Sequence, residues 1–200
     1  MTALPYESLR NQLKTGDIIL YSGKTPFSMA IRLATRCPWS HCGMVLKLEQ
    51  YDFLTVWEST LLTHIKDVET QQYMKGVQLM PLSERVRLYD GEIAVRQLQD
   101  VVFSEADTLR LMKLRKEISR RPYDFDILEM FRSAYDGIGG DNQEDLSSIF
   151  CSELVAEAYQ RLGLLDGELA SNEYTPADFA DDRKLKLLRG SLSQAIKIHR

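Results

Sequence analysis

Cysteine is scarce in this chain, which has only three, at positions 37, 42 and 151. An odd and sparse set of cysteines does not form a disulfide framework. The segment from Met1 to Asp17 also lacks the apolar stretch of a secretory signal. We therefore expect a cytoplasmic location, where reducing conditions keep the three thiols free for chemistry.

Long apolar runs and an excess of positive charge are absent as well. No apolar stretch approaches the roughly 18 residues that indicate a membrane-spanning helix. The formal net charge of −4 gives no electrostatic reason to expect a nucleic-acid partner, because affinity for phosphates depends on clustered Lys and Arg. The basic residues between 113 and 121 alternate with apolar ones, which favours a solvated helix face. We expect neither a transmembrane segment nor nucleic-acid binding, and nothing in the pattern indicates an oligomeric state.

The composition is that of an ordinary globular protein, with 44% hydrophobic and 27% charged residues in a chain of 200. This length favours one domain over residues 1–200, with a sizeable core. The apolar patterns predict strands at 17–21, 41–48, 53–59, 93–98 and 195–198, and helices at 27–35, 104–120, 151–162 and from 175. Residues 61–85 have no clear pattern. The order shows no regular βαβ alternation, so we predict the α+β class.

Cys151 is the first candidate for chemistry, because it stands where a Gly-rich and acidic loop, 136–147, gives way to a helix. The N-terminal end of a helix favours a thiolate, and its free N–H groups can bind an oxyanion. The alternative is a core residue. Cys151 shares a helical stripe with Leu154, Val155 and Ala158, and free cysteine is among the most buried residue types.

His41 and Glu58 are the candidate partners of this thiol. His41 opens the strand 41–48, on the face opposite to Cys42, which we expect to point into the core. Glu58 stands at the end of the apolar strand 53–59, where a carboxylate can fix the tautomer of an imidazole. A short link joins the two strands, and a hairpin would bring one side chain from each together. A structural histidine and an exposed carboxylate at the end of a strand are the alternatives.

A metal site is the rival use of these side chains, with Cys37, His41, Cys42 and Cys151 as ligands. No C-x-x-C pair is present, and adjacent His41 and Cys42 on a strand point to opposite faces. We therefore expect no metal and no cofactor.

Five short blocks follow one another in an order that resembles a known superfamily. They are Thr15-Gly16-Asp17-Ile18-Ile19-Leu20, Ser40-His41-Cys42-Gly43-Met44-Val45, Trp57-Glu58-Ser59, Phe150-Cys151-Ser152-Glu153-Leu154-Val155 and Tyr174-Thr175-Pro176-Ala177-Asp178. Together they resemble the circularly permuted branch of the NlpC/P60 papain-like superfamily, and most closely its YiiX/YaeF-like proteins. Histidine precedes cysteine here, whereas ordinary papain-like enzymes have the reverse order.

The resemblance implies a papain-like core, with a small antiparallel sheet or barrel packed against the helix that carries the nucleophile. It also implies Cys151 as nucleophile, His41 as general base and Glu58 as the orienting residue. The family is linked to hydrolysis of amide bonds, including those of cell-wall peptides, and related permuted members act on lipids by acyl transfer. The missing secretion signal and cell-wall-binding module speak against an extracellular peptidoglycan substrate.

We therefore predict a thiol hydrolase that cleaves an amide bond in a peptide-like or amino-acid-conjugated substrate through an acyl-enzyme. The alternatives are a lipid-directed thiol acyltransferase or esterase, and a non-catalytic binding module on the same fold. Ser40, Ser152 and Tyr123 are candidate substrate-binding residues, although core packing explains Tyr123 equally well. Segments 61–85 and 136–147 are candidate substrate-shaping loops. The acidic residues of 136–147 suggest a basic group on the substrate, with a solvated loop as the alternative.

Overall fold

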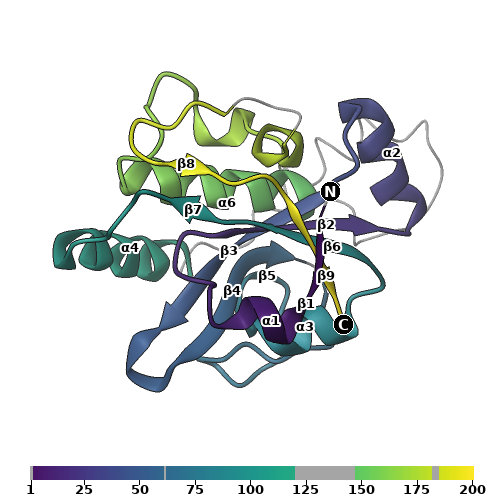
Figure 1. The fold of residues 1–200 in the computed structure, drawn as a ribbon, viewed down its shortest axis with the longest axis horizontal. Coiled ribbons are helices and arrows are strands. Elements are labelled where there is room, and N and C mark those ends of the chain that lie inside the picture. The colour runs from purple at the N-terminus through teal and green to yellow at the C-terminus, as the bar shows by residue number, and fades with distance from the viewer. Residues whose placement is uncertain (1, 61, 120–146, 182–184) are drawn as a thin grey trace.

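The chain was analysed as a computed structural model, in which residues 2–60, 62–119, 147–181 and 185–200 are described. Seven strands form one sheet in the order β1-β9-β6-β2-β3-β4-β5 (Figure 1). Their bounds are β1 Ala3–Pro5, β2 Ile18–Gly23, β3 His41–Leu48, β4 Phe53–Thr60, β5 Gly76–Pro81, β6 Gly91–Arg96 and β9 Ile196–His199. All neighbours are antiparallel except β1 and β9, which are parallel.

Within the described residues the sheet is open, because its edge strands β1 and β5 do not pair with each other. The α+β prediction is confirmed, whereas the barrel alternative is wrong. The predicted strand 93–98 is divided between β6 and β7, Leu98–Gln99, and β7 pairs with β8, Ser191–Leu192, in a separate small sheet.

Five helices complete the described fold: α1 Tyr6–Arg10, α2 Pro26–Thr35, α3 Leu82–Leu88, α4 Glu105–Ile118 and α6 Ser147–Arg161. Short 3₁₀ helices span Glu49–Tyr51, Ser171–Glu173 and Pro176–Phe179. The helix α4 starts where the sequence predicted, because Ser104 is its N-cap and forms a capping box with Asp107. The segment after Thr175 has the predicted capping pattern, but it forms a 3₁₀ turn rather than an α-helix.

The two faces of the sheet have separate apolar cores. On one face Leu20, Cys42 and Met44 pack with Leu154 and Val155 of α6. The other face carries a second cluster of fifteen buried residues, which includes residues of α1 and α3. Figure 1 shows α6 on one side of the sheet and both α1 and α3 on the other. Side chains alternate between the two faces along each strand, so neighbours in β3 enter different cores.

The predicted hairpin between β3 and β4 is present. Met44 pairs with Trp57 and Leu48 with Phe53, across the 3₁₀ turn of Glu49–Tyr51. Continuing this register by one residue places Gly43 opposite Glu58. A Cβ atom on Gly43 would lie 3.0 Å from the Cβ of Glu58 and 2.8 Å from Cγ2 of Val56. The absence of a side chain at Gly43 therefore leaves space for the side chains of Val56 and Glu58 in β4.

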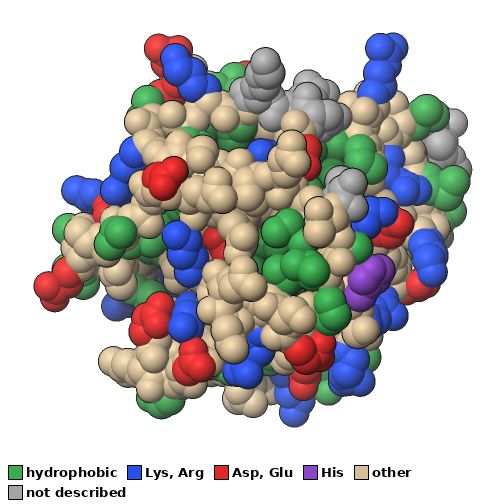
Figure 2. Space-filling model, viewed as in Figure 1, with side chains coloured by type: hydrophobic (Ala, Val, Ile, Leu, Met, Phe, Trp, Pro, Cys, Tyr) green, Lys and Arg blue, Asp and Glu red, His purple; other side chains and the backbone are tan. Residues whose placement is uncertain are grey.

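Charged side chains of both signs are interspersed over the face of the molecule in Figure 2, with no continuous basic patch there. No described helix is long and apolar enough to cross a membrane.

Candidate active site

His41 and Glu58 meet in the buried part of the sheet. Nε2 of His41 lies 2.7 Å from Oε2 of Glu58, and both residues are buried. The hairpin register therefore places the two side chains on a shared face, as the sequence predicted. Because Nε2 is engaged with the carboxylate, Nδ1 is the ring nitrogen that remains for a second partner.

Arg85 binds the second oxygen of the same carboxylate. Its Nε lies 2.6 Å from Oε1 of Glu58, and its side chain is 1% exposed. The guanidinium lies over two adjacent tyrosine rings, 4.5 Å from the centroid of Tyr21 and 4.8 Å from that of Tyr89. Glu58 is thus fixed through both oxygens, one toward the imidazole and one toward a cation.

This arrangement keeps Glu58 ionised although it is fully buried. Burial alone raises the pKa of a carboxyl group, but the charges of Arg85 and His41 outweigh it and lower the pKa of Glu58 to about 2. The carboxylate in turn favours the protonated form of His41. Burial lowers the pKa of His41, yet the negative charges of Cys151 and Glu58 raise it to about 9.

Cys151 approaches this pair from the opposite side of the sheet. It lies in α6, is fully buried, and is hydrogen-bonded to both His41 and Cys42. Burial raises the pKa of a thiol, but the hydrogen bond from Cys42 and the positive charge of His41 together lower that of Cys151 to about 5. Between these two pKa values the pair is a thiolate and an imidazolium, which is an activated nucleophile.

The start of α6 differs from the prediction. The helix begins at Ser147 rather than at Cys151, so the thiol belongs to its second turn. Only the first four N–H groups of a helix lack a partner within it. The position of Cys151 therefore no longer favours its own N–H group as the oxyanion donor, and the lowered pKa comes from His41 and Cys42 instead.

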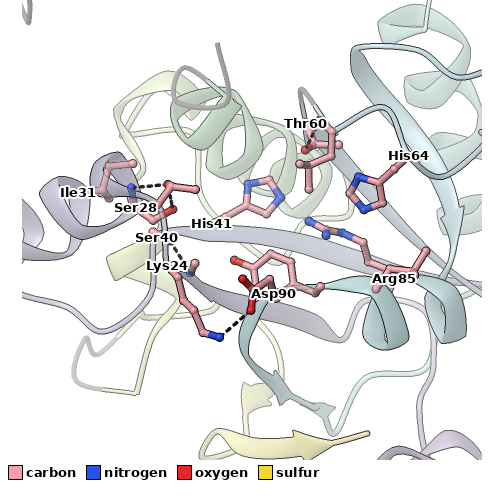
Figure 3. A pocket seen from close by; sticks show the side chains of 14 residues that line it. Lys24, Ser28, Ile31, Ser40, His41, Thr60, His64, Arg85 and Asp90 are labelled. Atoms are coloured by element: carbon pink, nitrogen blue, oxygen red, sulfur yellow. Dashed lines mark hydrogen bonds and ion pairs between the residues drawn. The ribbon is translucent and has the colours of Figure 1, made fainter. Parts of the chain in front are cut away.

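A pocket of about 430 Å³ opens beside His41. Figure 3 shows His41 and His64 on opposite sides of it, with the guanidinium of Arg85 between them. Most of its lining residues are polar, although apolar atoms make up more of its surface than polar ones. Ile31, Leu62 and Leu88 are its apolar side chains. The polar lining comprises Lys24, Thr25, Ser28, Ser40, Thr60, Tyr89 and Asp90 in addition to the two histidines and Arg85.

The predicted substrate-binding residues lie in different surroundings. Ser40 is part of the pocket wall next to His41. Ser152 is fully buried, and its hydroxyl donates a hydrogen bond of 2.7 Å to the carbonyl oxygen of Tyr174, so it links α6 to the segment before Pro176. Tyr123 and almost all of segment 136–147 lie outside the described residues.

Arg85 and Cys42 are the site residues that the sequence did not predict. Arg85 falls in the unassigned segment 61–85. A usable signal was present, because Arg85 stands between Leu82 and Val86 on the apolar stripe of α3, where a lone arginine indicates a buried charge with a partner. Cys42 was correctly placed in the core, but its contact with Cys151 depends on how α6 packs against β3.

A metal site finds no support in the described residues, where no group of three or more His, Cys, Asp or Glu side chains could hold an ion. Cys37, which was weighed as a ligand, is buried in the core on the α6 side of the sheet.

Comparison with known proteins places this chain in a family. The fold is similar to a crystal structure of the metalloprotein yiiX from Escherichia coli O157:H7, with a TM-score of 0.50 and 21% sequence identity. The similarity covers 94% of this chain and 98% of that one. No curated protein matches the chain. Residues 12–196 match the profile of the permuted papain-like amidase enzymes, YaeF/YiiX, C92 family, and the chain therefore belongs to this family of cysteine hydrolases.

Proposed function

We propose that this protein is a thiol amidase, with Cys151 as nucleophile, His41 as acid and base, and Glu58 as the residue that orients His41. One observation carries the proposal. His41 is hydrogen-bonded on one side to Cys151 and on the other to Glu58, and the carboxylate is itself fixed by Arg85. A thiol, an imidazole and a carboxylate in this order form the constellation of nucleophilic acyl transfer.

The first half of the reaction starts from the ion pair. The thiolate of Cys151 attacks the carbonyl carbon of the amide, and a C–S bond forms. The imidazolium of His41 then gives its proton to the amide nitrogen, the C–N bond breaks, and the amine leaves. Glu58 stabilises the imidazolium until that transfer and keeps the ring in one orientation.

The second half restores the enzyme. His41, now neutral, takes a proton from a water molecule as the oxygen attacks the thioester carbon. The C–S bond breaks, the carboxylic acid leaves, and Cys151 departs as a thiolate. The ion pair between Cys151 and His41 is thereby ready for another turnover.

The pocket beside His41 favours a small polar substrate over a long acyl chain. Ten of its fourteen lining residues carry hydroxyl, amino, imidazole, guanidinium or carboxylate groups, among them Lys24, Arg85 and Asp90. A long acyl chain would leave these charged and hydrogen-bonding groups without partners, whereas the polar groups of an amide substrate can bind them. We therefore prefer a peptide-like or amino-acid amide to the ester of a lipid. Since Cys151 is fully buried while His41 borders the pocket, productive binding also requires the sulfur to become accessible to the carbonyl.

The test is turnover of a substrate panel by the wild type and two variants. Aminoacyl and dipeptidyl amides form one arm, and long-chain acyl esters form the other. Cys151→Ala should abolish turnover while circular dichroism and the thermal midpoint stay close to the wild type, and Cys37→Ala, the matched loss of another buried thiol, should remain active. Wild type incubated with a slowly hydrolysed ester should gain the mass of the acyl group on the peptide that contains Cys151.

Two results would contradict the proposal. Full activity of Cys151→Ala on a verified substrate would refute Cys151 as nucleophile. Turnover confined to the long-chain esters would establish the lipid-directed alternative in place of the amidase.

A further inference from the structure

Cys42 is the neighbour of His41 in β3, but it points to the other face of the sheet. It pairs with Leu20 of β2, is fully buried, and belongs to the apolar core under α6. The same strand therefore offers Cys151 two neighbours from two faces. His41 and Cys42 are both hydrogen-bonded to its sulfur.

The contact between the two cysteines is a donor–acceptor contact. The Cys42 side chain and the backbone N–H of Cys42 are both hydrogen-bonded to Cys151. Burial raises the pKa of the Cys42 thiol well above its ordinary value, and the neighbouring negative charge of Cys151 raises it further. The imidazolium of His41 is hydrogen-bonded to Cys151, so Cys151 is the thiolate and the acceptor, and Cys42 keeps its proton.

We propose that Cys42 is a further catalytic residue, whose S–H and N–H groups donate hydrogen bonds to the Cys151 thiolate and hold it ionised beside His41. This inference rests on the proposed role of Cys151 as nucleophile. The alternating pattern of β3 predicts Cys42 only as a core residue, whereas this inference assigns its thiol a role in the reaction.

The charged surroundings of the two sulfurs leave Cys42 and His41 as the donors. His41 and Cys42 come from β3, Glu58 from β4 lies behind the imidazole, and Asp178 of the 3₁₀ turn adds a negative charge near Cys42. Glu58 and Asp178 both oppose ionisation of Cys42. A thiolate between an imidazolium and a protonated thiol has a donor on each side, which fixes its position as well as its charge.

The donor has a defined effect on the reaction. A thiol of lower pKa is a better leaving group. The hydrogen bonds from Cys42 therefore assist the step in which Cys151 departs from the acyl-enzyme. They also maintain the thiolate at pH values where an ordinary cysteine is protonated.

The experiment measures alkylation of Cys151 by iodoacetamide as a function of pH, resolved by mass spectrometry of the peptide that contains it. Cys42→Ala removes the thiol donor, and Cys42→Ser supplies a hydroxyl donor in nearly the same volume. Cys37→Ser serves as the control for a change at another buried cysteine. A hydrogen bond to a charged group corresponds to about one pKa unit or somewhat more.

We expect the midpoint of the alkylation profile to rise by about one pH unit in Cys42→Ala. The rate below both midpoints then falls about tenfold, while the limiting rate at high pH is unchanged or higher, because a more basic thiolate is a stronger nucleophile. Cys42→Ser should stay near the wild type, as should Cys37→Ser.

An unchanged midpoint in Cys42→Ala overturns the inference, and so does an equal shift in Cys42→Ala and Cys42→Ser. A uniform loss of rate at every pH would indicate damaged packing rather than a lost donor, and overturns it too. These outcomes are independent of any substrate. They are therefore separate from the Cys151→Ala turnover assay, whose failure would overturn the amidase proposal instead.

Discussion

The two faces of the sheet contribute different parts of the site. The face under α6 is apolar, and it supplies the two sulfur atoms of Cys42 and Cys151. The opposite face carries the ionic part, in which Arg85, Glu58 and His41 follow one another through hydrogen bonds of 2.6 and 2.7 Å. The two sets meet at the first residues of β3.

The two faces therefore have different roles: the apolar face surrounds the reactive thiol, and the opposite, ionic face, with Arg85, Glu58 and His41, supplies the charges and orients His41. The apolar face gives the thiol a dry environment, in which electrostatic interactions are strong. The ionic face provides the charge that makes the thiolate stable in that environment. A buried ion pair such as that of Arg85 and Glu58 is weak evidence for stability, since well-packed apolar residues often serve as well. We therefore interpret this pair as serving the orientation of His41.

The largest loss of stability is expected when Arg85, the cation bound to Glu58, is removed. Arg85→Met removes the guanidinium from buried Glu58 and leaves it only the His41 imidazolium among the described cations that contact it, and we expect this to lower the free energy of unfolding by about 3–5 kcal/mol in urea denaturation. Arg87→Met on the exposed side of the same helix should change it by less than about 0.5 kcal/mol. The pKa of Glu58 is lowered from 4.5 to about 2, so its ionic contribution is present above pH 4.5 and lost as the pH falls toward 2. The difference between the two variants should shrink accordingly.

A double variant distinguishes the contribution of the Arg85–Glu58 pair to stability from its contribution to the orientation of His41. Arg85→Met combined with Glu58→Leu removes both charges, and much of the lost stability should return while turnover does not. If turnover survives in the double variant, the ionic pair does not orient His41.

Glu58→Gln tests the electrostatic coupling within the ionic face. In the wild type kcat/KM should follow a bell with limbs near pH 5 and 9, because turnover needs both the thiolate and the imidazolium. The Glu58 carboxylate raises the pKa of His41, so its removal should lower that pKa and move the alkaline limb to lower pH. The fall in kcat/KM at pH 8 should be about tenfold or more. NMR titration of the His41 ring gives an independent reading, and an alkaline limb that stays near 9 would contradict the assignment.

The smallest effects come from one tyrosine on each face. On the α6 side the hydroxyl of Tyr159 donates a hydrogen bond of 2.6 Å to the carbonyl oxygen of Gly16. Tyr159→Phe should cost about 1–2 kcal/mol, because it leaves that buried carbonyl without this donor. The hydroxyl of Tyr21 has no hydrogen-bond partner among the described residues, so Tyr21→Phe should be nearly neutral in the same denaturation assay. Equal costs at both positions would contradict the difference between the faces.

Local patterns predicted the elements that carry the site well. The strand from His41 to Leu48 has the predicted bounds, and the strand from Phe53 ends one residue later than expected. Alternating side chains and a short connection define such a hairpin, and both are readable from neighbouring residues. The hairpin that makes the contact of His41 with Glu58 possible follows from the same local information, whereas its register does not.

Features that depend on distant packing were missed. Arg85 is 27 residues from Glu58 in sequence, and α3 is too short for its period to stand out in a mixed segment. The proximity of Cys42 and Cys151 depends on how α6 lies across β3, and no local pattern encodes it. The start of α6 was placed too late because the Gly-rich and acidic composition before it resembles a loop.

The position of β9 in the sheet has a consequence for synthesis on the ribosome. This strand lies between β1 and β6, although it follows β1 by nearly the whole chain and β6 by about half of it. Chains emerge from their N-terminal end, so the hairpin with His41 and Glu58 can form long before Cys151 is made. The sheet receives β9 later still. The nascent polypeptide thus carries the imidazole of His41 beside Glu58 before its nucleophile exists, and Cys151 joins them only when most of the protein that encloses this thiol has been made.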